Sequence, residues 1–305
     1  MTIAFIHPGK SFLPEIEAYK KFFAAKEIDA IEIDGENREE INADIEWHFM
    51  GTDNKRSTSK SVIIHEYASA STAPFSKAKN LIKQVYNRKP DFRLFLNSYV
   101  KGEFNFKDNI PFGFRDMGID ELFFNNNNSV SKEFDFLYTG SVEPEREIEK
   151  LLARFSENDL AQKSLLILSK DFSKLANQFS SFSNIRFAGP VPHEEVAAYI
   201  QRSRFCINYI PDKAPFNKQT PVKLLEYLAL RTPVISSRYE WMEQFQQQYG
   251  GNYFFLEMNL SNLNWENVLA HPYTFPDMHS WSWDTQIRSS GVLEFLKSKF
   301  PALQF

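Results

Sequence analysis

Short apolar runs alternate with amphipathic segments along most of this 305-residue chain. One series extends from an apolar run at 2–6 to another at 92–96, and a second extends from 134–138 to an amphipathic segment at 240–249. Strands that alternate with helices favour parallel sheets covered by helices, so the pattern predicts an α/β fold with two doubly wound halves. Ligands of such sheets bind at the carboxyl ends of the strands, which points to a cleft between the halves.

A polar run at 125–129 interrupts the alternation and predicts the boundary between the two halves. The predicted domains are therefore 1–128 and 129–280, although an ordinary surface loop at 125–129 is the alternative. Residues 281–300 are predicted to form one long helix within a C-terminal segment, 281–305.

Composition excludes several function classes. The net charge is −4, which is not the signature of a nucleic-acid-binding protein. The single cysteine, Cys206, fits a reducing compartment, and neither a secretory signal nor an apolar run of about 18 residues is recognisable. Zinc-type spacing, Walker loops and GxGxxG are absent from the sequence. We therefore expect a cytoplasmic protein without a metal or cofactor.

The segment from Thr220 to Ser236 reads as a short helix followed by a buried strand. Thr220 is expected to cap this helix, with Pro221 in its first turn, where a missing N–H costs nothing. Lys223 and Glu226 are three residues apart and share a face. The free N–H groups of the helix start suit a phosphate together with Lys223, and Glu226 could accept hydrogen bonds from sugar hydroxyls. An ordinary surface ion pair between the two side chains is the alternative.

The same segment resembles the donor-binding helix of GT-B glycosyltransferases of the group 1, family 4-like type, through Pro221-x-Lys223-Leu224-x-Glu226-Tyr227-Leu228-Ala229 and then Thr232-Pro233-Val234-Ile235-Ser236. The resemblance implies two Rossmann-like domains facing a cleft, with Lys223 toward the donor diphosphate and Glu226 toward its ribose. It implies an acceptor-binding domain at 1–128, a donor domain at 129–280, and a C-terminal helix that returns to the first domain. The remaining donor-binding residues that it implies are Gly140, Gly189, Val191, Tyr209, Lys218 and Leu224.

Two departures from the family pattern leave the stereochemistry open. Many retaining members carry an acid eight residues before the position of Glu226, where this chain has Lys218. The basic pair expected after the first glycine turn is also missing, so the phosphate charge is expected to be met by Lys223, Lys218 or Arg146.

An inverting enzyme needs a general base for the acceptor hydroxyl. The candidates are His65 and Glu66, at the end of a predicted strand, and then Asp116 and His48. Neighbouring strand residues point to opposite faces, so His65 and Glu66 cannot easily both face a cleft. A buried or rim histidine bonded to backbone is the alternative for His65.

A basic stretch runs from Lys55 to Lys101, with ten lysines and arginines against Glu66 and Asp91. The predicted helix at 75–86 places Lys79 and Lys83 on one face and is expected to pack Leu81, Ile82 and Val85 inward. An anionic acceptor or the inner face of a membrane would complement this charge, and a solvated helix face is the alternative. The basic residues are Lys55, Arg56, Lys60, Lys77, Lys79, Lys83, Arg88, Lys89, Arg93 and Lys101.

These observations predict a glycosyltransferase that moves a sugar from a nucleoside-diphosphate donor, such as a UDP-sugar, to an unidentified polysaccharide or lipid-linked acceptor. Helix N–H groups and lysine, rather than a metal, would stabilise the diphosphate leaving group. A non-catalytic nucleotide-sugar-binding subunit with the same fold is the alternative, and a sugar-nucleotide epimerase is a third class.

Overall fold

The computed structural model describes residues 1–9, 13–34, 42–49, 53, 60–71, 75–126, 130–303 and 305. The chain divides into two compact units, unit 1 with Met1–Gly118 and Trp281–Phe305, and unit 2 with Ile119–Ser280. The chain thus enters unit 2 ten residues before the predicted boundary at 128. The reason is that the short 3-10 helix η1 (Glu121–Phe124) contacts helices of unit 2. The predicted linker at 125–129 lies partly outside the described residues.

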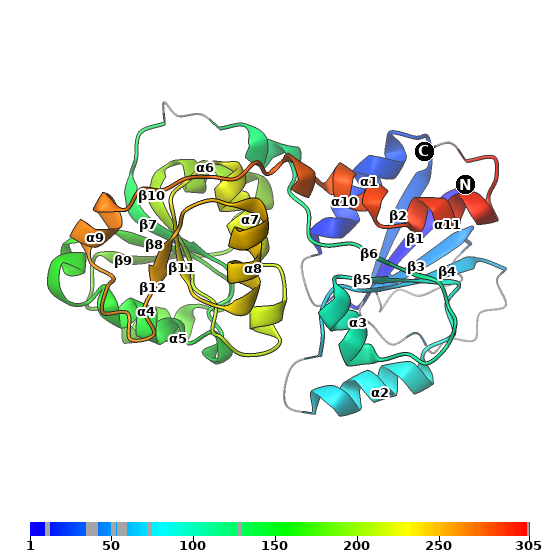
Figure 1. The fold of residues 1–305 in the computed structure, drawn as a ribbon, viewed down its shortest axis with the longest axis horizontal. Helices are drawn as coiled ribbons and strands as arrows, with labels where there is room; N and C mark the ends of the chain where they lie inside the picture. The colour runs from blue at the N-terminus through cyan, green and yellow to red at the C-terminus, as the bar shows by residue number, and fades with distance from the viewer. Residues whose placement is uncertain are drawn as a thin grey trace. The chain divides into compact units, whose positions relative to one another are not determined.

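Unit 1 contains a six-stranded parallel sheet with the order β2-β1-β3-β4-β5-β6. Helices α1, α10 and α11 cover one face of the sheet, and α3 with α2 lies on the other (Figure 1). The strands are β1 (Thr2–His7), β2 (Asp29–Asp34), β3 (Ile45–Phe49), β4 (Val62–Tyr67), β5 (Phe92–Phe95) and β6 (Phe112–Phe114). The helices are α1 (Pro14–Ala24), α2 (Ser76–Tyr86), α3 (Ser98–Phe104), α10 (Trp283–Ser289) and α11 (Val292–Lys299).

The core of unit 1 is rich in aromatic side chains. Tyr19 from α1 packs against Trp47 from β3, with ring centroids 4.5 Å apart. Phe92 stacks on Phe295 of α11 at 4.7 Å, so a residue late in the sequence completes a core that begins at β1. Large rings bury much apolar area, and this packing explains part of the high phenylalanine content.

The predicted long C-terminal helix is wrong in detail, because the structure has two helices, α10 and α11, in its place. Gly291 separates them with φ +79°, a left-handed conformation that glycine adopts without strain. A side chain at Gly118 would collide with the Trp283 ring, since an added Cβ would lie 2.3 Å from it. The C-terminal segment therefore packs closely within unit 1.

Unit 2 contains a second six-stranded parallel sheet, with the order β12-β11-β10-β7-β8-β9. The order reverses between β7 and β10, and right-handed crossovers then place α4 and α5 on one face and α6, α7 and α8 on the other. The strands are β7 (Phe134–Thr139), β8 (Leu165–Leu168), β9 (Ile185–Ala188), β10 (Ser203–Asn208), β11 (Val234–Ser237) and β12 (Phe254–Leu256). The helices are α4 (Ile148–Arg154), α5 (Ser173–Gln178), α6 (His193–Gln201), α7 (Val222–Ala229), α8 (Glu240–Tyr249) and α9 (Trp265–Ala270).

Helix α2 differs from the prediction for its packing. Leu81, Ile82 and Val85 are exposed instead of turned inward. The inward face carries Asn80 and Gln84, whose amide groups donate to the backbone carbonyls of Glu103 and Phe104 at the end of α3. Carbonyls at a helix end need donors, so polar side chains suit this contact better than apolar ones.

Candidate functional site

Helix α7 begins at the carboxyl edge of the second sheet, at the point where the strand order reverses. Tyr227 fixes it there, because its hydroxyl accepts the Thr139 N–H at 3.0 Å and lies 2.8 Å from the Thr139 hydroxyl. Thr139 ends β7 and Gly140 follows it. Such a reversal point is where ligands of open parallel sheets bind.

The expected capping of this helix is wrong. Pro221, and not Thr220, occupies the N-cap position, Val222 is the first helical residue, and the N-cap side chain makes no capping hydrogen bond. N–H groups at a helix start suit an anion. Leu224 is fully buried and packs in the interior of unit 2.

The ammonium group of Lys223 lies in an unusual environment. Its Nζ lies over the Tyr138 ring, 3.8 Å from the centroid. A Cβ added at Gly140, where φ is +119°, would lie 4.0 Å from that Nζ, so the glycine leaves the space beside the amine open. Burial and the nearby Arg146 hold the pKa of Lys223 well below its usual value. Within the described residues, Lys223 forms no ion pair.

Arg146 supplies a second cation at the same place. It ends the short 3-10 helix η2 (Pro144–Arg146), and its guanidinium lies over the Phe216 ring at 4.1 Å. Its Nε is buried and has no hydrogen-bond partner among the described residues, which also provide no carboxylate for it. Two neighbouring cations without a counter-charge favour binding of a multiply charged anion.

Lys218, the third predicted phosphate ligand, is paired differently. It ends the short 3-10 helix η4 (Phe216–Lys218), and its ammonium donates to the Glu240 carboxylate at the start of α8. Because Glu240 already balances its charge, Lys218 contributes less positive potential than Lys223 or Arg146.

Glu226 is 5% exposed, and its carboxylate lies 2.7 Å from Nε2 of His193, the first residue of α6. The alternative of a surface pair between Lys223 and Glu226 is therefore wrong. Burial raises the pKa of Glu226. Although burial opposes the charged imidazolium, the Glu226 carboxylate raises the pKa of His193. His193 is a site residue that the sequence did not predict, because no local spacing connects two positions 33 residues apart.

The other predicted donor residues follow two further strands of the same sheet, β9 and β10. Gly189 comes directly after β9, and Val191 lies two residues further along the connection to α6. Tyr209 comes directly after β10, is 8% exposed, and packs in the hydrophobic core of unit 2. Gly189 therefore lies at the same carboxyl edge of the sheet as Gly140, whereas the Tyr209 ring packs in the core of unit 2.

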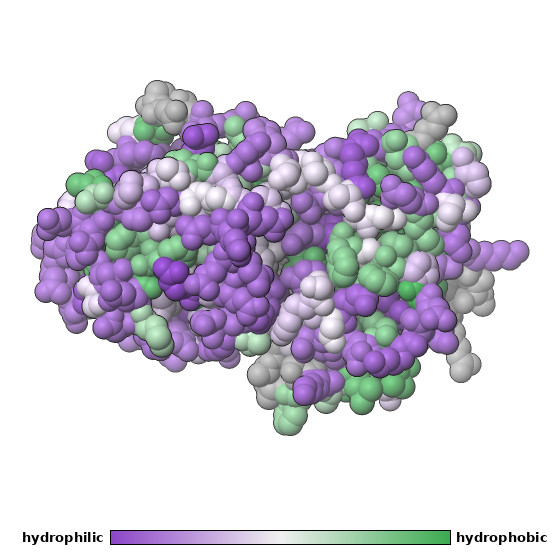
Figure 2. Space-filling view, viewed as in Figure 1, coloured by the Kyte–Doolittle hydropathy of each residue, from purple (hydrophilic) through white to green (hydrophobic). Residues whose placement is uncertain are grey.

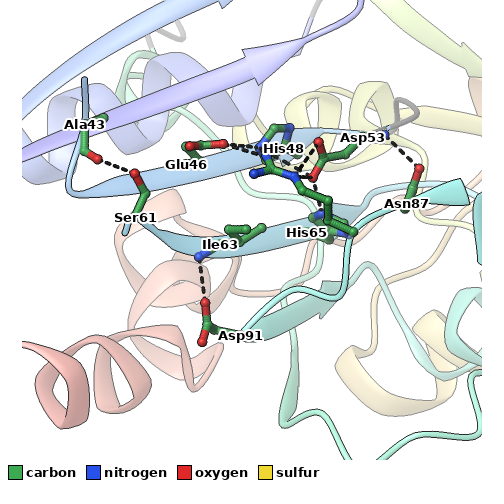
Figure 3. Close-up of polar contacts among 10 residues, drawn as sticks. Ala43, Glu46, His48, Asp53, Ser61, Ile63, His65, Asn87 and Asp91 are labelled. Atoms are coloured by element: carbon green, nitrogen blue, oxygen red, sulfur yellow. Dashed lines mark hydrogen bonds and ion pairs between the residues drawn. The ribbon is translucent and has the colours of Figure 1, made fainter. Parts of the chain in front are cut away.

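In unit 1, His65 lies in a buried polar cluster on β3 and β4 (Figure 3). It is 3% exposed, its Nε2 lies 3.1 Å from Asp53 Oδ2, and its Nδ1 lies 3.4 Å from the Tyr67 hydroxyl. Burial lowers the pKa of His65, although the Asp53 carboxylate opposes this shift. The remaining members are Glu46, His48 and Arg88, with Arg88 bound to both Asp53 and Glu46.

Glu66 points to the opposite face of β4 and lies in a second buried network. Its Oε2 accepts the Trp47 indole N–H at 2.8 Å and the Tyr19 hydroxyl at 3.2 Å. Its Oε1 accepts the Arg115 guanidinium, which is itself buried. Asp116 follows β6, is half-buried, and accepts the Met117 N–H at 2.8 Å.

The basic stretch is only partly a basic surface. Arg88 is paired within the polar cluster, and Arg93 binds the Asp108 carboxylate with both terminal nitrogens at 2.5 and 2.8 Å. Lys55 and Arg56 lie outside the described residues. The exposed lysines of α2, Lys77 and Lys79, therefore provide much of the basic surface that was predicted for this stretch.

No group of histidine, cysteine and acidic side chains among the described residues could hold a metal ion. None of the helices in this part of the chain is long and apolar enough to cross a membrane.

Comparison with known proteins agrees with this arrangement. Residues 133–257 match the family model described as Glycosyl transferases group 1, which confirms the resemblance for the part of unit 2 that holds α7. No protein among the curated sequences matches the chain.

Solved structures with low sequence identity share the fold. Sucrose-phosphate synthase from Thermosynechococcus elongatus has a TM-score of 0.63 at 11% identity, with 99% of this chain and 100% of that chain covered. AviGT4, a glycosyltransferase involved in avilamycin A biosynthesis, has a TM-score of 0.60 at 11% identity, with coverage of 99% and 98%. A T4 phage BGT mutant solved with UDP-glucose has a TM-score of 0.52 at 11% identity and covers both chains fully. Together with the two parallel sheets, these likenesses confirm the predicted GT-B fold.

Proposed function

We propose that this protein is a glycosyltransferase that transfers a sugar from a nucleoside-diphosphate donor bound at the carboxyl edge of the unit 2 sheet. The single observation that carries the proposal is the pair of Lys223 and Arg146, two cations without a carboxylate partner among the described residues, beside Gly140. A diphosphate would supply the missing negative charge. The group 1 match of residues 133–257 and the nucleotide-sugar complex of a structural neighbour support the same donor class.

The proposed mechanism assigns the leaving group to unit 2. As the glycosidic bond to the donor breaks, negative charge grows on the diphosphate, and Lys223, Arg146 and the start of α7 would stabilise that charge. Fixed cations and helix N–H groups that need no rearrangement are effective at this task. The proposed reaction uses these groups in place of a metal ion.

Glu226 is proposed to bind the ribose hydroxyls of the donor. His193 then acts as a positioning residue, because its bond to Glu226 orients this carboxylate and opposes the rise in pKa that burial causes. An ionised carboxylate accepts hydrogen bonds from two neighbouring hydroxyls, whereas a protonated one also donates.

Asp116 is the preferred candidate for the general base, if the reaction inverts the anomeric carbon. Its partial exposure supports this choice, since a base must reach the acceptor hydroxyl. His65 and Glu66 remain predictions, but both lie in buried networks that use their polar atoms. The acceptor is proposed to be a polysaccharide or a lipid-linked molecule at the inner face of a membrane.

Incubation with a panel of UDP-, GDP- and ADP-sugars, scored by nucleotide release with and without chelator, tests the proposal. Release that depends on an acceptor and is abolished in Lys223→Met and Arg146→Gln is expected. Tight nucleotide binding without turnover on any acceptor would favour the non-catalytic subunit, and interconversion of the free nucleotide sugar would favour an epimerase. NMR of the product anomer then decides between inversion and retention.

A further inference from the structure

Helix α2 buries its polar side and exposes its apolar side, which is the reverse of an ordinary surface helix. A surface helix buries its apolar stripe and exposes its polar face. In α2, the buried side is polar, with Asn80 at 1% exposure and Gln84 bonded to α3, while the outer side is apolar. In Figure 2, hydrophobic residues are visible at the lower edge of unit 1, where Figure 1 places α2.

The outer side carries five large apolar residues. Their exposed fractions range from 49% for Ile82 to 79% for Phe75, and half of the exposed large hydrophobic residues among the described ones lie in this short segment. Single exposed apolar residues are normal on a protein surface, whereas a gathered set marks an interaction site. The set consists of Phe75, Leu81, Ile82, Val85 and Tyr86, and we call it the outer apolar face.

Lysines accompany this face, and the helix contains no acid. Lys77 and Lys79 are exposed. Lys83 instead lies against α3, with Nζ 5.7 Å from the Phe104 ring centroid, and burial together with Lys79 lowers its pKa. The surface that α2 presents is therefore both apolar and cationic.

We propose that the outer apolar face of α2 inserts into the headgroup region of a bilayer that contains acidic lipids. Amphipathic helices that lie in a membrane interface combine large apolar residues with lysines in this way. Protein–protein interfaces are depleted in lysine, which argues against an ordinary protein partner. In a symmetric dimer the same patch would face itself, and the lysines of the two copies would repel each other.

The inference goes beyond the proposed function, because vesicle binding requires neither donor nor turnover. The protein alone is sedimented with vesicles of phosphatidylcholine containing about one-third phosphatidylglycerol, and with pure phosphatidylcholine vesicles. Binding to the acidic vesicles that weakens at high salt is expected, since such attraction is screened within about 10 Å at 0.1 M salt.

Two double variants separate the apolar and the electrostatic contributions. Leu81→Gln with Val85→Gln should lower the partition coefficient at least tenfold, because each side chain would otherwise leave water. Lys77→Gln with Lys79→Gln should lower it about 30-fold, the equivalent of about 1 kcal/mol for each lysine. The changed side chains are exposed, so both variants should fold and keep nucleotide affinity.

Matched controls come from unit 2. Leu269→Gln removes a leucine that is 59% exposed on α9, and Lys170→Gln with Lys174→Gln removes two exposed lysines. These controls should bind acidic vesicles like the wild-type protein. Equal loss in the controls and the α2 variants would overturn the assignment to α2.

Insertion is measured directly with a polarity-sensitive dye. Cys206 is the only cysteine and is buried, so Val85→Cys creates a single exposed labelling site. A blue shift with acidic vesicles is expected, and its absence would overturn insertion. Concentration-dependent dimerisation that Leu81→Gln with Val85→Gln abolishes would also overturn the proposal, because the face would then bind a second copy.

Discussion

Neutralising Lys223 should stabilise the free protein and weaken its binding to nucleoside diphosphates. The ammonium of Lys223 is partly buried, is repelled by Arg146, and has no carboxylate partner among the described residues, and these conditions lower its pKa. A lowered pKa for a lysine means that the folded protein disfavours the charged form. Lys223→Met keeps most of the apolar stem but removes the charge, so stability and affinity should change in opposite directions.

The structure sets the size of each change. Loss of the contact with Tyr138, 3.8 Å from Nζ, costs about 0.5–1 kcal/mol. Relief of desolvation and of repulsion by Arg146 outweighs that loss, for a net gain of about 1 kcal/mol, in the range of other substitutions at strained functional sites. For a unit of this size the gain corresponds to about 2–4 °C in the unfolding temperature. A lost hydrogen bond to the charged diphosphate, at about 1.5–3 kcal/mol, weakens binding about 10- to 150-fold.

Scanning calorimetry measures the first quantity and titration calorimetry with UDP, GDP and ADP the second. Lys174→Met removes one exposed lysine from α5 and controls for the change in net charge. It should leave both quantities unchanged. A Lys223→Met protein that unfolds earlier than the wild type and binds nucleotides equally well would refute the reasoning, because Lys223 would then be a structural residue.

Three further substitutions test the remaining assignments. Arg146→Gln should weaken the binding of nucleoside diphosphates about tenfold or more, and the binding of unphosphorylated nucleosides hardly at all, because Arg146 neutralises phosphate charge. Titration calorimetry measures both affinities, and an equal loss of affinity for the two ligands would contradict this role. Because Glu226 raises the pKa of His193 above its usual 6.5, their pair stabilises unit 2 fully below pH 6.5 and less as the pH rises through the raised pKa. Urea unfolding at pH 6 and pH 8 should therefore show a smaller decline in stability for His193→Gln than for wild type, and equal declines would count against the pair. Glu66→Gln leaves the buried Arg115 without its nearest counter-charge and should destabilise unit 1 by about 3–5 kcal/mol, whereas a protein of normal stability that fails only in turnover would return Glu66 to the role of general base.

The sequence by itself determined the two αβ series and the helix that carries Lys223 and Glu226. These features depend on local periodicity, since the residues of a buried face recur every two positions in a strand and every three or four positions in a helix. The group 1 resemblance of this segment was visible for the same reason, because its residues are contiguous. The boundary near 281 was also visible, and the chain re-enters unit 1 at Trp281.

Only the tertiary structure decided which side chains meet at the site. His193 and Glu226 form an ion pair although they are 33 residues apart in the chain. Glu240 pairs with Lys218, so Lys218 is not one of the unpaired cations. The sequence predicted the wrong inner face for α2. Apolar periodicity identifies the apolar side of a helix, but it does not show whether that side packs against the rest of the protein. Burial, pairing and exposure depend on contacts between segments far apart in the chain, and these contacts exist only once both sheets have formed.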